Sequence, residues 1–148
     1  MDSSVSRPLA QFIAWGRVGI GTSAILAPTL MARPWIGPGA GDSGSRLLAR
    51  TMGGRDLALG FGALRALHLS DAEARPWVAL GGMADAVDAL ATVLAFGSLP
   101  RRRRWGILAV TVGAAVVSTR VAESMDSTAV GTGTVHRAAP DGVLPTPA

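Results

Sequence analysis

Four apolar segments, each long enough to cross a lipid bilayer as a helix, constrain the fold of this chain most strongly. They cover approximately residues 8–32, 46–69, 76–99 and 105–122. An α-helix rises about 1.5 Å per residue, so about 20 residues cross a hydrocarbon core about 30 Å thick. With 148 residues the chain has room for one domain. The pattern predicts an all-α fold, a four-helix transmembrane bundle at residues 8–122, followed by a disordered C-terminal tail at residues 123–148.

Prolines and tryptophans mark the ends of these apolar segments. Pro28 is expected to kink or end the first helix, because proline lacks a backbone N–H and clashes with the preceding turn. Pro76 suits the first turn of the third helix, where that N–H has no partner in any case. Trp35, Trp77 and Trp105 fall at predicted ends, where an amphipathic indole ring prefers the headgroup region. This placement agrees independently with the predicted spans.

The first two segments are separated by residues 33–45, which are rich in glycine and proline. We expect a loop there, with Ser43 or Ser45 capping the next helix. The run from Gly39 to Gly44 matches the dinucleotide-binding pattern Gly-x-Gly-x-x-Gly. That pattern requires a preceding strand within a βαβ unit, and neither is predicted here, so we interpret the run as part of the loop.

Charged residues lie deep within three of the apolar segments: Arg17, Arg55, Asp56, Asp85 and Asp88. Counted from the segment ends, Arg17, Arg55 and Asp85 lie roughly 14 Å into a core about 30 Å thick. A charge at that depth costs about 2.5–3.5 kcal/mol even on insertion scales. We therefore predict a charged layer near mid-bilayer in which these residues pair. With two arginines against three aspartates, one carboxylate is expected to lack a partner.

Small residues share helix faces with these charges. Gly53 and Gly60 lie on the face of Asp56 in the second segment, and Gly81 lies one turn before Asp85 in the third. Small residues let the backbones of membrane helices approach closely. We expect these three glycines to be helix-packing positions.

The basic residues are all arginines, 14 against 10 acidic residues. Most lie within or beside apolar segments, where they are typical topology signals, so no nucleic-acid partner is expected. Four of them form the short loop before the last segment: Arg101, Arg102, Arg103 and Arg104. A short basic loop favours the cytoplasmic side, which places both termini outside a multi-pass protein of the inner cell membrane. The same loop also suits anionic lipid headgroups.

Motifs for known chemistry are sparse. The chain has no cysteine, and its two histidines, His68 and His136, have no ligand-spaced partners, so neither a catalytic residue, a metal site nor a cofactor is predicted. The pair Asp85 and Asp88 is similar to the Asp-x-x-Asp that opens the metal site of membrane CDP-alcohol phosphotransferases. The Ala-Arg pair and the second acidic motif of those enzymes do not follow here, which disfavours that class.

The second segment carries the pattern Arg-x-x-Gly-x-Arg-Asp-x-x-x-Gly from Arg50 to Gly60. Together with Arg17 and the paired Asp85 and Asp88, it resembles a family of small four-helix integral membrane proteins of unknown function from actinobacteria. More distantly, the chain is similar to the DoxX-like four-helix membrane proteins, some of which accompany redox enzymes. The resemblance covers approximately residues 10–122 and implies a fold, not a reaction. The absence of cysteine argues against a thiol-redox role.

Two kinds of function are compatible with these features. The first hypothesis is a structural or accessory subunit that is not an enzyme, partnered by the lipid bilayer and by other membrane subunits or itself. The alternative is a small proton- or cation-linked transporter, or a lipid- or small-molecule-binding protein, that uses Asp85 and Asp88 and assembles as a homo-oligomer. A lipid- or quinone-linked enzyme and a soluble helical bundle are less favoured.

Overall fold

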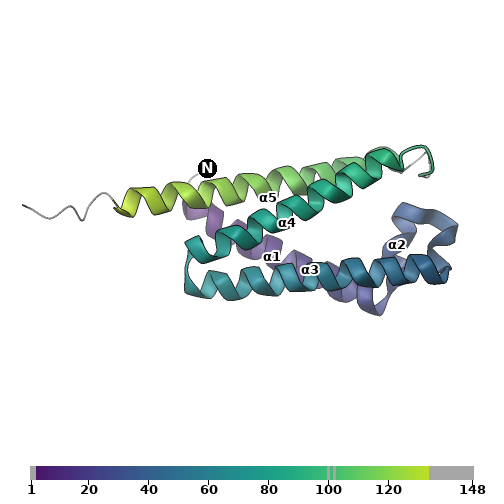
Figure 1. Ribbon diagram of the computed structural model, residues 1–148, viewed down its shortest axis with the longest axis horizontal. Helices are drawn as coiled ribbons and strands as arrows, with labels where there is room; N and C mark the ends of the chain where they lie inside the picture. The colour runs from purple at the N-terminus through teal and green to yellow at the C-terminus, as the bar shows by residue number, and fades with distance from the viewer. Residues whose placement is uncertain (1–2, 100, 102, 134–148) are drawn as a thin grey trace, which may run out of the picture.

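The structure is a computed structural model that describes residues 3–99, 101 and 103–133, with the side chains of residues 5–99, 101 and 103–125 (Figure 1). This part of the chain is entirely helical apart from short connections, which confirms the all-α prediction. Its elements in chain order are α1 (Ser3–Leu26), α2 (Pro28–Ile36), the short 3-10 helix η1 (Gly37–Gly41), α3 (Ser43–Leu69), α4 (Asp71–Leu94) and α5 (Arg104–Gly133).

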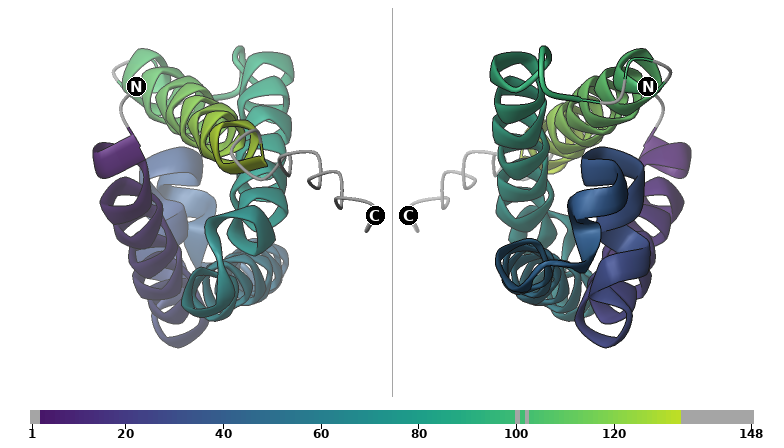
Figure 2. Two further views of the ribbon diagram at one scale, coloured as in Figure 1. Left: turned by 90° about the vertical axis from the view of Figure 1, so that its left-hand side faces the viewer. Right: turned by 90° about the vertical axis from the view of Figure 1, so that its right-hand side faces the viewer.

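The four long helices α1, α3, α4 and α5 run up and down along one axis (Figures 1 and 2). The most extensive packing joins α1 to α3 and α4 to α5, and α3 packs against α4 between these two pairs. A smaller contact between α1 and α5 closes the bundle. The short α2 and η1 pack against α3, at the end of the bundle where α1 ends and α3 begins. The beginning of α1 and the end of α5 consequently lie at the same end of the bundle.

The connection from α1 to α3 differs from the expected loop. Pro28 ends the first helix as predicted, but it also occupies the first turn of a new helix, α2, where its missing N–H costs nothing. Most of residues 33–45 are therefore helical, in α2 and η1. A backbone reversal at Gly37, with φ of 73°, ends α2 in a conformation that only glycine adopts easily.

Asp42 caps α3, in place of the expected Ser43 or Ser45. Its carboxylate accepts the backbone N–H of Ser45 at 2.7 Å and the hydroxyl of Ser45 at 2.9 Å. These hydrogen bonds to the charged form, the backbone one foremost, hold the pKa of Asp42 below its usual value. Ser45 therefore donates hydrogen bonds to the capping residue and is not itself the cap.

The other helix ends also differ from the segment boundaries. Ser70 accepts the backbone N–H of Glu73 at 3.1 Å and caps α4, which begins at Asp71 and carries Pro76 inside it. This helix ends at Leu94, before the expected residue 99, and continues into turns.

The last helix is longer than the fourth predicted span. α5 begins at Arg104 and continues to Gly133, so the first part of the predicted tail, residues 123–133, is helical. The rest of that tail, residues 134–148, lies outside the described residues.

Three helices in the described part of the chain are long and apolar enough to cross a membrane by length and composition: Val5–Leu26, Asp71–Leu94 and Arg104–Met125. Helix α3 is long enough but is interrupted by charge, at Arg46, Arg50, Arg55, Asp56 and Arg65. The protein thus has the helices of a multi-pass membrane protein, and the charges on α3 need a separate account.

Small side chains fill the interior of the bundle, and large apolar ones lie on its surface. The interior consists largely of small residues, among them Ala10, Ala14 and Ala74, which are almost fully buried. Large apolar side chains point outward, including Phe12 and Leu94, which are more than two-thirds exposed. In water this arrangement would leave an extensive apolar surface, whereas small residues at helix contacts and large ones facing lipid are typical of membrane helices.

Glycines set the close approach of α1 and α3. A Cβ at Gly53 would lie 2.7 Å from the carbonyl oxygen of Gly21, and one at Gly21 would lie 2.6 Å from the carbonyl oxygen of Gly53. At Gly60 a Cβ would lie 2.8 Å from the carbonyl oxygen of Ala14. Both Gly53 and Gly60 therefore lie at the interface between these helices, where no larger residue fits without displacing the backbone.

We expect Gly53→Ala to lower the free energy of unfolding by about 1–3 kcal/mol, because the added methyl group forces the two backbones apart. Gly54→Ala is the matched control, since a Cβ at Gly54 meets nothing within 4 Å. It should be neutral or stabilising by up to about 1 kcal/mol through the higher helix propensity of alanine. Equilibrium unfolding in mixed detergent micelles measures both. Equal effects of the two substitutions would contradict the close packing at Gly53.

Candidate functional site

Arg17 is the centre of a charge network that crosses the bundle. From α1 its Nη1 donates to Oδ1 of Asp56 on α3 at 3.1 Å, and its Nη2 donates to Oδ2 of Asp85 on α4 at 2.5 Å. A single guanidinium group thereby joins three helices. The side chain of Arg17 is 10% exposed, and those of Asp56 and Asp85 are 13% and 14% exposed, so the three charges are largely withdrawn from the surface.

Arg55 extends the network to Asp88. Its two Nη atoms donate to the two carboxylate oxygens of Asp88, at 3.0 and 2.8 Å, in the paired geometry that makes arginine–carboxylate contacts strong. Its Nη2 also lies 3.4 Å from Oδ1 of Asp56. The network therefore runs continuously in the order Asp85, Arg17, Asp56, Arg55, Asp88. We call these five residues the charge network.

Helical geometry explains why these residues can meet. Asp85 and Asp88 are three residues apart and lie on one face of α4. Arg55 and Asp56 are adjacent in α3, so their side chains diverge by about 100° around the helix. Asp56 reaches Arg17 on α1, and Arg55 reaches Asp88 on α4. Through Arg55 and Asp56, α3 thus forms ion pairs with two neighbouring helices, α4 and α1.

Gly81 makes room for a side chain of a neighbouring helix, whereas Gly53 and Gly60 make room for a neighbouring backbone. A Cβ at this position would lie 2.9 Å from both Nε and Nη2 of Arg17. The missing side chain therefore leaves room on α4 for the guanidinium group that binds Asp85, one turn further along. Gly82, the next residue, is the one that faces α5, beside Ser118 and Thr119.

The expected unpaired carboxylate is not found. Each of Asp56, Asp85 and Asp88 has an arginine partner, because Arg17 and Arg55 each bind two carboxylates. The expectation matched each arginine with a single aspartate. A guanidinium group has five N–H donors and can therefore bind two carboxylates. The two arginines and three aspartates still sum to a formal charge of −1.

The two ends of the charge network differ in exposure. The side chains of Arg55 and Asp88 are 32% and 23% exposed, against 10% for Arg17 and 14% for Asp85. The Nε atom of Arg55 is buried and has no hydrogen-bond partner among the described residues. The network thus has a closed end at Arg17 and an open end between α3 and α4.

Two hydroxyl groups lie beside the network, and sequence reasoning missed one of them, that of Ser118. Ser118 of α5, which is 2% exposed, donates to Oδ2 of Asp85 at 3.4 Å. Thr92 donates to the backbone carbonyl of Asp88 at 2.7 Å. A signal for Ser118 was present, because it lies seven residues after Thr111 and both interrupt the apolar run of α5 on one face. Through Ser118 the fourth long helix also contacts the network.

A second ion pair lies at the end of the bundle where α1 begins. Arg7 donates to Asp71 at 2.5 Å and to the backbone carbonyl of Leu67, and so joins α1 to the turn between α3 and α4. Its side chain is 44% exposed, so its contribution is smaller than that of the buried network.

Arg104, the last residue of the arginine run, packs against an aromatic pair formed by Phe96 and Trp105. The guanidinium group of Arg104 lies 4.7 Å from the ring centre of Phe96, and this ring meets Trp105 edge to face at 4.9 Å. Arg101 and Arg103 are exposed, and Arg102 lies outside the described residues.

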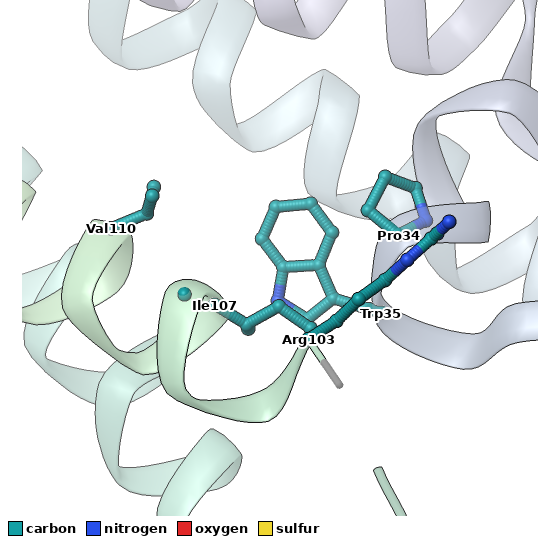
Figure 3. A pocket seen from close by; sticks show the side chains of 6 residues that line it. Pro34, Trp35, Arg103, Ile107 and Val110 are labelled. Carbon is teal, nitrogen blue, oxygen red and sulfur yellow. The ribbon is translucent and has the colours of Figure 1, made fainter. Parts of the chain in front are cut away.

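Beside this loop is a hollow of about 380 Å³ between α2 and α5 (Figure 3). It is lined by Pro34, Trp35, Arg103, Gly106, Ile107 and Val110, none of which belongs to the charge network.

Metal-ligating residues are not gathered in the described ranges. No group of three histidine, cysteine, aspartate or glutamate residues is placed there to hold a metal ion. His68 is exposed in the last turn of α3, and His136 lies outside those ranges.

No family model, no curated protein and no solved structure matches this chain. The resemblance of the Arg50–Gly60 pattern to small actinobacterial four-helix membrane proteins, and the more distant one to DoxX-like proteins, therefore stays a prediction.

We expect Arg17→Gln to destabilise the bundle by about 3–5 kcal/mol, since it leaves two buried carboxylates facing each other without their shared cation. In the double variant Arg17→Gln/Asp85→Asn, the loss should be smaller than the sum of the single losses by about 1–3 kcal/mol. Unfolding of the four proteins in mixed micelles gives this coupling energy.

The control for general loss of charge is Arg120→Gln. Arg120 pairs with Glu123 at 3.6 Å, and the two side chains are 75% and 61% exposed. We expect a change within about 0.5 kcal/mol. Strict additivity of Arg17→Gln and Asp85→Asn would show that the pair does not act as a unit.

Proposed function

We propose that the chain is a four-span integral membrane protein in which α1, α3, α4 and α5 all cross the bilayer, and that it serves as a structural or accessory subunit without enzymatic activity. The observation that carries this proposal is the complete pairing of the charges in the middle of α3. The chemistry of these contacts is that of a packing element, since each of the five charged side chains is bound to an oppositely charged one from the network.

The pairing removes the main objection to a membrane position for α3. Each charge at mid-bilayer costs about 2.5–3.5 kcal/mol on insertion scales, and Arg55 and Asp56 would both incur this cost if α3 inserted alone. In the bundle, α1 supplies Arg17 to Asp56, and α4 supplies Asp88 to Arg55. The outward face of α3 carries the exposed apolar residues Leu47, Leu48 and Phe61. Its exposed arginines, Arg46, Arg50 and Arg65, lie towards the two ends of the helix.

A structural role also accounts for the specificity of the contacts. Apolar helices in lipid gain little from one register over another, whereas a charge that reaches its partner in only one register favours that register strongly. Arg17 contacts α3 and α4 at once, and Asp85 on α4 also receives the hydroxyl group of α5. The charge network would therefore align all four long helices.

The proposed orientation follows the arginine loop. Residues 101–104 favour the cytoplasmic side, so that both termini lie outside the inner membrane. The Arg50–Gly60 pattern includes both α3 members of the charge network and the two glycines that meet α1. We expect the same pattern to be a device for helix packing in the small actinobacterial four-helix membrane proteins that the chain resembles.

Cysteine labelling tests the four-span arrangement, because the chain has no cysteine to remove. We expect Gly41→Cys and Gly97→Cys to be protected from a membrane-impermeant maleimide in intact cells, and Ala72→Cys to be labelled. The two glycines have open space at their Cβ positions and Ala72 is exposed, so the substitutions should not disturb the fold.

The pattern of labelling separates the alternatives. If residues 41 and 72 are labelled from the same side, α3 does not cross and the four-span arrangement is wrong. If Ala72→Cys alone is protected, the four spans hold but the orientation is inverted. Permeabilised cells, in which all three sites should react, provide the control.

A second candidate, a small proton- or cation-linked transporter or binding protein, is favoured by the formal charge of −1 on the network and by its open end at Arg55 and Asp88. A cation or proton would enter there between α3 and α4. Asp88 is the carboxylate at that end, whereas Asp85 lies at the closed end.

Proteoliposomes distinguish the two candidates. For a structural subunit we expect no proton or sodium uptake above that of protein-free liposomes, measured with an enclosed pH-sensitive dye and with radioactive sodium. Uptake that is lost in Asp88→Asn but kept in Asp71→Asn would establish the second candidate instead. Asp71 is the matched control, because it is also paired with an arginine but lies at the end of the bundle.

A further inference from the structure

The hollow between α2 and α5 combines apolar walls with one cation. Pro34 and Trp35 of α2 form one wall, and Ile107 and Val110 of α5 form the other (Figure 3). Arg103 also lines the hollow, and its side chain runs towards the side of Pro34 in this view (Figure 3). A Cβ at Gly106, the sixth lining residue, would meet nothing within 4 Å, so the space beside it is open.

The positive charge of Arg103 is not balanced by an acidic residue in the lining of the hollow. No acidic residue lines it, and none occurs in the first turn of α5. The N-terminal end of a long helix carries a partial positive charge from its unpaired N–H groups. Arginines at that end are therefore repelled by the helix dipole. Arg103 immediately precedes α5, and Arg104 is its first residue. An anion bound beside Arg103 would relieve this repulsion.

The position of the hollow suggests the source of the anion. In the four-span arrangement proposed above, α5 enters the membrane at Arg104, and Trp35 and Trp105 lie at headgroup level. The hollow would then open where a phospholipid carries its phosphate above its acyl chains. A volume of about 380 Å³ accommodates part of an acyl chain and not a whole lipid.

We propose that this hollow binds one anionic phospholipid from the surrounding bilayer. Its phosphate lies at Arg103, and the upper part of one acyl chain lies against Trp35, Ile107 and Val110. The lipid thereby holds the short α2 against α5, two elements that contact each other little directly. This inference rests on the proposed membrane position of the bundle, but not on the function of the charge network.

The charge part is tested with the purified full chain, freed of lipid in a mild detergent. Native mass spectrometry measures the binding of dioleoyl phosphatidylglycerol and of the zwitterionic dioleoyl phosphatidylcholine. We expect a preference for phosphatidylglycerol that Arg103→Gln reduces about fivefold, the ratio given by about 1 kcal/mol per basic residue near an anionic surface. Arg120→Gln should keep the preference, because Arg120 lies several turns further along α5 and does not line the hollow.

The apolar part is tested by filling the hollow. Gly106→Leu should abolish tight binding of phosphatidylglycerol, since its side chain would project into the space of the acyl chain. Gly113→Leu is the matched control, because Gly113 lies on the same helix, also has open space at its Cβ position and does not line the hollow. A soluble headgroup, glycerol phosphate, should bind at least tenfold more weakly than the lipid.

The possible results separate the lipid site from the membrane fold. Unchanged binding in both Arg103→Gln and Gly106→Leu would overturn the lipid site, even if cysteine labelling establishes all four spans. Equal binding of glycerol phosphate and lipid would also overturn it, since the hollow would then be an anion site only. Labelling of residues 41 and 72 from one side would instead refute the four-span fold, whatever the lipid binding shows.

Discussion

The contact on which the rest of this structure depends is the one from Arg17 to Asp56 and Asp85. It places a cation and two anions from three helices within hydrogen-bond distance in a largely buried layer. Withdrawing these charges from water is costly, and leaving any one of them unpaired would cost more. The bundle is therefore committed to the register in which all of them meet. The helix packing is adapted to these ion pairs at Gly81, because the guanidinium group of Arg17 lies where a larger residue would place its side chain.

The small interior follows from the same demand. For Arg17 to reach Asp56, α1 and α3 must run close together, and the contact of Gly21 with Gly53 brings their backbones into touch. A core of large side chains would separate the helices and stretch the ion pairs. The large apolar residues consequently face outward, where lipid can solvate them. The unusual combination of a small, charged interior and a large, apolar exterior thus has a single physical cause.

Sequence reasoning predicted that these charges pair within one layer, but it did not identify which side chains pair. Depth follows from a constant rise per residue and from visible segment ends, so Arg17, Arg55 and Asp85 could be assigned to one layer. Pairing depends on rotamers and on how many carboxylates one guanidinium group serves, which residue counts do not contain. Ser118 was missed because a lone serine in an apolar helix has many uses. Helix ends were misjudged where tertiary packing extends a helix through breakers, as α2 continues through Pro34.

The unequal exposure of the network bears on how such a layer relates to function. At the closed end, Arg17 contacts both α3 and α4, and any movement between these helices would break a buried pair. At the open end, the two Nη atoms of Arg55 bind the two carboxylate oxygens of Asp88 at a more exposed position. In the proposed bilayer this position faces lipid or a neighbouring subunit, where an unpaired charge is costly. One end is thus enclosed by the bundle, and the other can be reached from outside it. A polar group from a neighbouring subunit, or an ion, would therefore engage the network at Arg55 and Asp88 while Arg17 keeps the helices aligned.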